Sequence, residues 1–145
     1  MARVSTYLNF ERETEEAFAF YKSVFGTDYE GPVMRYSEMP EEEGAPAIPN
    51  ADMQLVLHMA LPIIGGHVLM GSDNPESVGY PLKVGNNSSI MLELDTRDET
   101  ERLFKALSEG GEIDMELSDM FWGDYFGSFA DKFGIQWMVS CPSGK

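Results

Sequence analysis

The 145-residue sequence has few cysteines, few basic residues and few histidines, and each shortage excludes a class of protein. Cys141 is the only cysteine, so no internal disulfide can form. Ten Lys and Arg residues against 25 Asp and Glu residues give a formal net charge of −15. Because phosphate binding needs clustered Lys and Arg, we expect no nucleic-acid partner. The negative charge promotes solubility, and it also suits a cationic ligand.

Long apolar runs are missing as well. No stretch approaches the roughly 20 apolar residues of a membrane-spanning helix, and the opening segment Met1–Tyr7 lacks the apolar region of a secretory signal. The sequence therefore predicts a cytoplasmic protein with no membrane partner. The hydrophobic fraction of 43% is ordinary for a globular protein, and the length is common for one domain.

Hydrophobic periodicity predicts the order strand, helix and three strands, and it predicts this order twice. The predicted elements of the first copy are a strand over Val4–Phe10, a helix over Thr14–Phe25, and strands over Gly31–Met39, Ala51–Ile64 and His67–Ser72. Those of the second copy are a strand over Ser88–Asp95, a helix over Asp98–Leu107, and strands over Glu112–Leu117, Asp124–Ala130 and Ile135–Ser140.

Local signals support several of these boundaries. Gly26 follows the first helix and suits its C-terminal cap. Asp98, with Glu101 three residues later, predicts a capping box at the start of the second helix. Gly65-Gly66 predicts a hairpin turn with positive φ at both residues. The prolines and three consecutive glutamates of Pro40–Asn50 predict an exposed loop.

The two copies align at one constant offset, which pairs Thr6 with Ser89 and Tyr21 with Phe104. A shared offset for strand and helix favours a true internal repeat. The sequence therefore predicts an α+β fold of two tandem β-α-β-β-β modules within a single domain, residues 1–145. Module one covers about 1–73, a connector 74–87, and module two about 88–145.

Strand alternation predicts which side chains face the helices. In the strand over Ser88–Asp95, the apolar Ile90, Leu92 and Leu94 should pack on a helix, and Ser89, Met91, Glu93 and Asp95 should face the other way. In the last strand Trp137 belongs to the packing set and Met138 to the opposite one. Helices on one face and mixed polarity on the other suggest a ligand-holding concavity. The alternative is a solvated face, or one covered by a second subunit.

Three groups of segments carry a family resemblance. They are Tyr7–Phe10 with the helix ending Phe20–Gly26, His58–Leu61 running through Gly65-Gly66 to Val68–Asp73, and Phe121–Gly127 continuing to Ala130–Met138. Together they resemble PhnB-like proteins of the glyoxalase/bleomycin resistance/dioxygenase (vicinal oxygen chelate) superfamily. The resemblance covers nearly the whole chain. It implies paired modules whose sheets close a cup around a small molecule, assembled as a homodimer.

In metal-using relatives, the resemblance implies four His, Glu or Gln ligands on the first and fourth strands of each module. The metal then acts as a Lewis acid on substrate oxygens or binds dioxygen. The aligned positions here carry Thr6, Ser89, Met138 or its neighbour Trp137, and Met70 or Ser72. None of these is a usual ligand for zinc, nickel or ferrous iron. We therefore expect no metal and no other cofactor at these positions.

The sequence gives weaker evidence for other kinds of metal binding, catalysis or ligand binding. His58 and His67 flank the Gly65-Gly66 turn and could approach each other, with Glu93, Asp95 or Asp124 completing an alternative metal site. Cys141 has no activating neighbour, so a structural thiol is favoured. A methyltransferase needs a nucleotide-binding fold for the methyl donor, and this order of elements does not offer one. Trp122 beside Asp124 suits a cationic or ring-bearing ligand, or else Trp122 packs the core and Asp124 serves a turn.

The leading hypothesis is a metal-free protein that binds a small molecule in the cup, with sequestration of a cationic drug as a subtype. The predicted ligand-binding residues are Thr6, Leu8, His58, Met70, Ser72, Ser89, Glu93, Trp122, Asp124 and Met138. The alternatives are a metal-dependent lyase or dioxygenase with a non-standard metal site, and a structural role in which the paired sheets serve only dimerisation.

Overall fold

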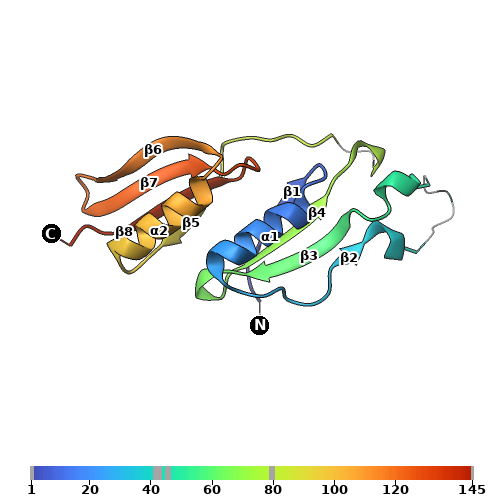
Figure 1. The fold of residues 1–145 in the computed structure, drawn as a ribbon, viewed down its shortest axis with the longest axis horizontal. Coiled ribbons are helices and arrows are strands. Elements are labelled where there is room, and N and C mark those ends of the chain that lie inside the picture. Colours follow the sequence, from blue (N-terminus) through green and yellow to red (C-terminus); the bar gives the residue numbers. More distant parts are fainter. Residues whose placement is uncertain (1, 41–43, 45–46, 79–80, 145) are drawn as a thin grey trace. The chain divides into compact units, whose positions relative to one another are not determined.

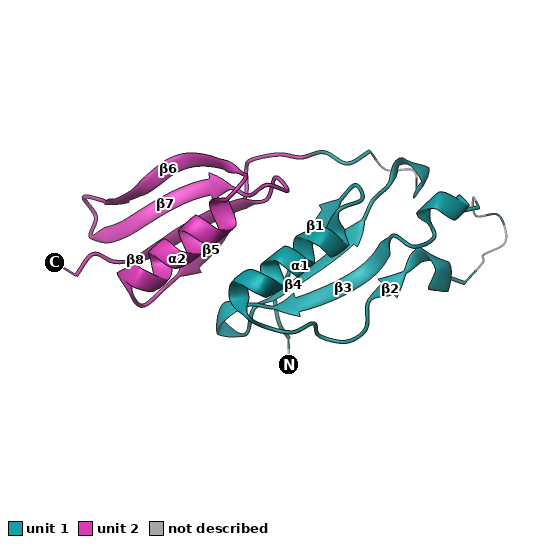
Figure 2. Ribbon diagram, viewed as in Figure 1, with its two compact units in different colours: residues 1–83 teal, residues 84–145 magenta. Residues whose placement is uncertain are grey.

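The computed structural model describes residues 2–40, 44, 47–78 and 81–144. Residues 41–43 and 45–46 of the predicted loop over Pro40–Asn50 lie outside these residues. The chain divides into two compact units, Met1–Lys83 and Val84–Lys145 (Figure 2). Neither helix of the described chain combines the length and apolar character that a bilayer span requires.

Each unit contains one helix and one four-stranded sheet (Figure 1). The first unit contains β1 (Thr6–Phe10), α1 (Thr14–Phe25), β2 (Met34–Arg35), β3 (Val56–Pro62) and β4 (Val68–Asp73), with the strand order β1-β4-β3-β2. The second contains β5 (Ile90–Glu93), α2 (Arg97–Ser108), β6 (Glu112–Asp119), β7 (Asp124–Ala130) and β8 (Gln136–Pro142), with the strand order β5-β8-β7-β6. The β1–β4 and β5–β8 pairs are parallel, and the other pairs are antiparallel. The predicted α+β fold of two tandem β-α-β-β-β modules is confirmed.

Helix α1 forms where the sequence predicts it because its apolar residues recur on one face. The buried residues Ala17, Phe18, Tyr21 and Val24 form that face. The helix ends at Gly26, which adopts φ 68° and donates its N–H to the Lys22 carbonyl. This left-handed conformation favours glycine and confirms the predicted cap.

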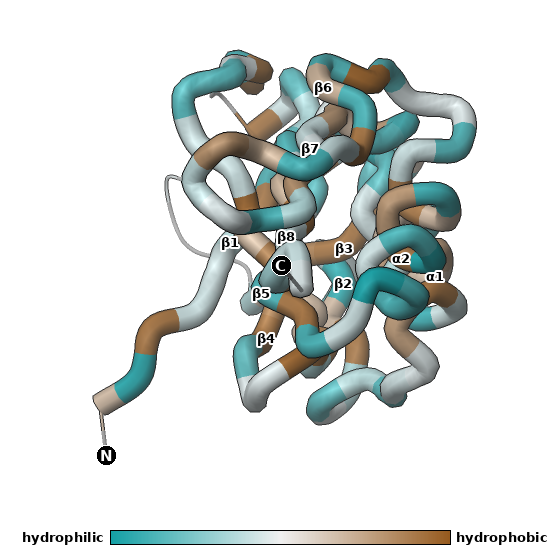
Figure 3. The backbone as a smooth tube through the Cα atoms, turned by 90° about the vertical axis from the view of Figure 1, so that its left-hand side faces the viewer, coloured by the Kyte–Doolittle hydropathy of each residue, from teal (hydrophilic) through white to brown (hydrophobic). Residues whose placement is uncertain are grey.

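Helix α2 packs on the second sheet through a second apolar cluster. Leu103, Phe104 and Leu107 are buried, and the Phe104 ring meets the Phe129 ring edge-to-face at 5.2 Å between centroids. Leu92 on β5 is buried in the same core, as the alternation of that strand predicted. Figure 3 shows brown hydrophobic and teal hydrophilic stretches along both helices.

The N-terminal cap of α2 differs from the prediction. Helix α2 begins at Arg97, and the Thr96 side chain accepts a 3.2 Å hydrogen bond from the Glu99 N–H. Thr96 therefore caps the helix, and Asp98 lies inside its first turn. Threonine in extended conformation is among the favoured N-cap residues, because its side-chain oxygen accepts a hydrogen bond from a free amide of the first turn.

Four predicted strands are shorter in the structure: β1 begins at Thr6, β5 spans only Ile90–Glu93, and β2 and β3 differ most. The strand predicted over Gly31–Met39 is reduced to β2, and a 3₁₀ turn at Tyr36–Glu38 follows it. The strand predicted over Ala51–Ile64 begins only at Val56, after a 3₁₀ turn at Asn50–Asp52. The Asp52 carboxylate is buried against Arg12 at 2.9 Å and Ser77 at 2.6 Å, which holds this segment outside the sheet.

The turn between β3 and β4 has the predicted backbone conformation. Gly65 and Gly66 adopt φ values of 68° and 78°. They belong to a 3₁₀ turn, Ile64–Gly66, which His67 closes by donating its N–H to the Ile64 carbonyl. Positive φ at two consecutive residues is readily adopted only by glycine, so the pair fixes how β3 turns into β4.

Candidate functional site

Each sheet has one face packed on its helix and an opposite face, called here the open face. In the second sheet Trp137, Val139 and Leu92 are buried on the helix side. Because side chains alternate along a strand, their neighbours Met91 and Met138 belong to the open face, where the register places them side by side. This confirms the predicted division of β5 and β8 into packing and open sets.

Several predicted ligand-binding residues share the open face of the second sheet. Glu93 pairs with Ser140, which pairs with Phe126 on β7. The Trp122 ring lies 6.1 Å from the Phe126 ring and is 53% exposed. Asp124, at the start of β7, lies two positions before Phe126, so both side chains belong to the same face of the sheet. An aromatic pair and two carboxylates therefore belong to one surface.

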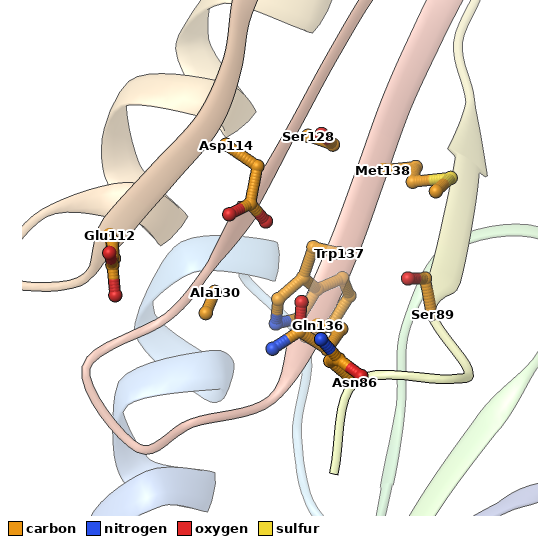
Figure 4. A pocket seen from close by; sticks show the side chains of 9 residues that line it. All are labelled: Asn86, Ser89, Glu112, Asp114, Ser128, Ala130, Gln136, Trp137 and Met138. Atoms are coloured by element: carbon orange, nitrogen blue, oxygen red, sulfur yellow. The ribbon is translucent and has the colours of Figure 1, made fainter.

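A hollow of about 340 Å³ lies at the other end of this surface (Figure 4). Its lining comes from the segment before β5 and from strands β6, β7 and β8. The lining residues are Asn86, Ser89, Glu112, Asp114, Ser128, Ala130, Gln136, Trp137 and Met138. We call it the acidic hollow, because Glu112 and Asp114 are its only charged residues. Ser89 and Met138 were predicted site residues, whereas Glu112 and Asp114 were not.

The first sheet has an open face of different chemistry. The register places Tyr7 beside Met70, Met70 beside Ala60, and Asn9 beside Ser72. The Tyr7 hydroxyl lies 3.4 Å from Nδ1 of His58, and their rings are 5.9 Å apart at an interplanar angle of 33°. The Ser72 hydroxyl donates to the Asn9 side-chain carbonyl at 3.3 Å. His58, Met70 and Ser72 therefore share one face with Tyr7 and Asn9, two residues that the prediction lacked.

Thr6 and Leu8 lie on the other side of the first sheet, which corrects their predicted placement. Leu8 is only 8% exposed, and its partner on β4 is Gly71, whose surroundings are the Phe18 ring and Thr14 of α1. Thr6 lies two positions before Leu8 and so belongs to the same face of β1. Its hydroxyl is hydrogen-bonded to Nε2 of His67 at 2.7 Å. A slip of one residue moves every side chain of a strand to the opposite face.

The two histidines are not brought together. His58 precedes Met59, which pairs with Gly71, and His67 precedes β4 at the turn. Four residues of extended strand lead from His67 to Gly71, about 13 Å along the sheet. His58 lies well before the Gly65-Gly66 turn and His67 directly follows it, so the turn does not create the alternative metal site built on both histidines.

The donor set on the four strands that hold metal in metal-using relatives can now be stated. The open-face positions are Tyr7 and Asn9 on β1, Met70 and Ser72 on β4, Met91 and Glu93 on β5, and Gln136, Met138 and Ser140 on β8. Glu93 is the only carboxylate among them, and no imidazole is present. Only Glu93 and Gln136 are of the residue types that hold metal in metal-using relatives, which is two of the four ligands of such a centre. Within the part of the chain that the structure describes, no group of three or more His, Cys, Asp or Glu side chains could hold a metal ion.

Comparison of the sequence with models of known protein families identifies the class of protein that has this fold. The family model of the Glyoxalase/Bleomycin resistance protein/Dioxygenase superfamily matches residues 5–139. The chain therefore belongs to this superfamily, and the predicted resemblance is confirmed.

Individual relatives give a finer assignment. Protein YjdN of Escherichia coli K12 is 28% identical over 144 residues, which are 94% of this chain and 93% of YjdN. The crystal structure of PA1353 from Pseudomonas aeruginosa is similar at 35% identity with a TM-score of 0.82, covering 98% of each chain. A PhnB protein from Bacillus cereus is similar at 26% identity with a TM-score of 0.75, covering 97% of this chain and 99% of its own. The chain is a PhnB-like protein of the glyoxalase fold.

Proposed function

We propose that this PhnB-like protein binds a cationic small molecule on the open face of the second sheet, without a metal ion. The observation that carries the proposal is the acidic hollow, which presents Glu112 and Asp114 and no basic side chain among its nine lining residues. A volume of about 340 Å³ is within the range of small-molecule sites. A net charge of −15 adds a long-range attraction for cations.

The rest of the open face suits a cation that carries a ring. The Trp122 and Phe126 rings offer π faces next to the predicted site residues Glu93 and Asp124. A cation over such a ring is attracted by its quadrupole, most strongly when water is displaced. Met138 contributes a flexible, polarisable thioether that adapts to ligands of different shape. Sequestration of a basic drug, such as a cationic glycopeptide, is therefore the form of binding that we propose.

Calorimetry tests this proposal directly. We expect a cationic glycopeptide of the bleomycin type to bind with measurable heat at about 0.05 M salt, and the affinity to fall at about 0.5 M salt because ions screen the attraction. The Glu112→Gln/Asp114→Asn double variant should bind about tenfold more weakly, since two charge-assisted contacts are lost.

A charge-matched control separates local contacts from net charge. The Glu76→Gln/Glu109→Gln variant removes two carboxylates that are outside the acidic hollow. It should keep the affinity of the original protein within about twofold. Equal loss in both double variants, or no heat with a panel of cationic drugs, would refute binding at the acidic hollow.

The metal-free part of the proposal has its own test. The open-face donors of β1, β4, β5 and β8 are mainly hydroxyl, amide and thioether groups, which hold divalent transition metals poorly. We expect elemental analysis of the purified protein to give far less than one equivalent of zinc, nickel or iron, before and after incubation with each ion. Stoichiometric metal would instead support the alternative of a lyase or dioxygenase.

The family resemblance also underlies two further parts of the proposal, assembly as a homodimer and a cytoplasmic location. Exposed apolar side chains at Met91, Met115 and Phe121 support association of the second unit with another surface. Sedimentation equilibrium measures the mass of the assembly and thus decides between monomer and dimer.

A further inference from the structure

Strand β6 forms one edge of the second sheet (Figure 1). Strand β7 pairs with one side of it, and no strand within the described residues 84–144 pairs with the other side. All eight residues of β6 except Leu117 are exposed. A long exposed edge presents a row of backbone N–H and C=O groups to which another extended chain can bond. The proposed binding of a small cation does not use this row.

The side of this edge that faces α2 is apolar. Ile113 pairs with Phe129, which is 0% exposed and meets the Phe104 ring of α2. Leu117 lies on the same side, because a Cβ atom added at Gly127 would meet Leu117 at 3.1 Å and Phe104 at 2.8 Å. Helix α2 nevertheless leaves Ile113 41% exposed. A strand added next to β6 would therefore remove apolar surface from water if it carried apolar residues on this side.

The opposite side of the edge is acidic. Glu112 pairs with Ala130, and both residues line the acidic hollow together with Asp114. Glu116 follows two positions after Asp114 and is also exposed. Because opposite charges on neighbouring strands stabilise their pairing, a strand added next to β6 should carry lysine or arginine on this side. Side chains of a strand alternate between its two faces, so the complementary sequence alternates basic and apolar residues.

The composition of β6 argues against a second copy of this strand as the occupant. Its eight residues include four carboxylates and no basic side chain. Two β6 strands side by side would place like charges next to each other, which destabilises the pair. The register with β7 also shifts twice, between Ile113 and Met115 and between Met115 and Ser118. Charges and bulges are devices that keep an edge strand from pairing indiscriminately, so this edge should accept only a short, complementary strand.

We propose that the outer edge of β6 binds an extended segment of a protein partner in which basic and apolar residues alternate. The segment bonds through its backbone to the exposed N–H and C=O groups of β6 and adds a fifth strand to the second sheet. Its apolar side chains cover Ile113, and its basic side chains meet the carboxylates of Glu112 and Asp114. This docking does not require the proposed small-molecule binding, although both would use those two carboxylates.

Amide NMR of the full chain, labelled with ¹⁵N, tests the proposal with the blocked peptide Lys-Val-Lys-Val-Lys. The peptide should shift the β6 amide signals in a saturable manner and slow their hydrogen exchange, because new backbone hydrogen bonds protect amides. The same peptide with every backbone nitrogen methylated keeps its charges but has no backbone donor. It should bind at least tenfold more weakly.

Two charge-matched variants locate the binding. Glu116→Lys reverses a charge on β6 and lies outside the acidic hollow, so it should weaken peptide binding about fivefold. Glu76→Lys makes the same change in net charge at an exposed position of the first unit and should keep peptide binding within about twofold. Thermal unfolding of each variant verifies that it is folded.

Three outcomes would overturn the proposal. Equal binding of the methylated peptide, or equal loss in the two folded variants, would mean that net charge alone attracts the peptide. Slow exchange of the β6 amides in concentrated protein without peptide would identify a second copy as the occupant. Peptide-induced shifts at the acidic hollow with unchanged β6 exchange would leave only binding of cations there. Peptide docking at β6 in a protein that fails to bind small cations would support this inference and count only against the proposed function.

Discussion

Replacing Trp137 by alanine is expected to lower the free energy of unfolding by about 4 kcal/mol, within the range for large aromatic residues in cores. Trp137 is 0% exposed and lies between Ile90 and Phe129 in the sheet register. Its indole N–H donates to the Asp131 carboxylate at 2.8 Å. The same carboxylate accepts from the Phe133 and Ile135 amides, at 2.8 and 3.1 Å. The substitution therefore leaves a cavity and also deprives a buried carboxylate of one donor.

The Trp137→Phe variant separates these two contributions. Phenylalanine keeps most of the ring volume but has no N–H, so the expected loss is about 1–2 kcal/mol from the charge-assisted hydrogen bond and the smaller cavity. Urea denaturation followed by far-UV circular dichroism measures both variants without relying on tryptophan fluorescence. A loss below about 1 kcal/mol for Trp137→Ala would show that the site collapses around the gap, contrary to a tightly packed core.

Elements with strong local signals could be predicted to the residue. Helix α1 spans Thr14–Phe25 and β7 spans Asp124–Ala130, both as the sequence indicated. In α1 the helical spacing of apolar residues ends at a glycine that favours the left-handed cap. The hydrophobic period and the helix-end signal therefore predict the same boundary. Sequence reasoning succeeds where a short segment contains all the information that determines its conformation.

The phase of β1 shows how a repeat can mislead. Three residues separate Phe10, buried on the helix side of β1, from the start of α1, whereas two separate Leu94, buried on the helix side, from the start of α2. A single offset that aligns the helices therefore misaligns the strands by one residue, and it moved Thr6 and Leu8 to the wrong face. The alternation within β1, with Leu8 and Phe10 apolar and Asn9 polar, correctly predicts that Leu8 and Phe10 face the helix.

The functional surfaces depend on information that the sequence does not express locally. Tyr7 and His58 are 51 positions apart, and they meet only because β4 pairs with both β1 and β3. Likewise Glu112 and Asp114 line the acidic hollow because β6 pairs with β7, which pairs with β8. Composition could indicate a cation-binding protein, but only strand order identifies which carboxylates share a site.

The Gly111→Ala substitution is expected to lower the free energy of unfolding by about 3 kcal/mol, the upper part of the usual range for overpacking. Gly111 lies between α2 and β6, and its N–H donates to the Ser108 carbonyl at 2.9 Å. A Cβ atom added there would lie 2.1 Å from the Ala130 carbonyl oxygen and 2.8 Å from the carbonyl carbon of Asp131. Both are backbone atoms, so a rotamer change cannot relieve the clash and the end of β7 must move.

This movement should reach the ligand site as well as the stability. Glu112 of the acidic hollow pairs with Ala130, and Asp131 holds the Trp137 indole, so a shift of β7 displaces both. Gly85→Ala is the matched control, because its nearest neighbour beyond the adjacent residues is the Asn87 side-chain oxygen at 3.8 Å, and its cost should stay within about 0.5 kcal/mol. Urea denaturation of both variants gives the comparison, and calorimetry with the cationic ligand should show weaker binding only for Gly111→Ala. If the two variants were equally stable, the backbone at Gly111 would not be packed as tightly against the end of β7 as the structure indicates.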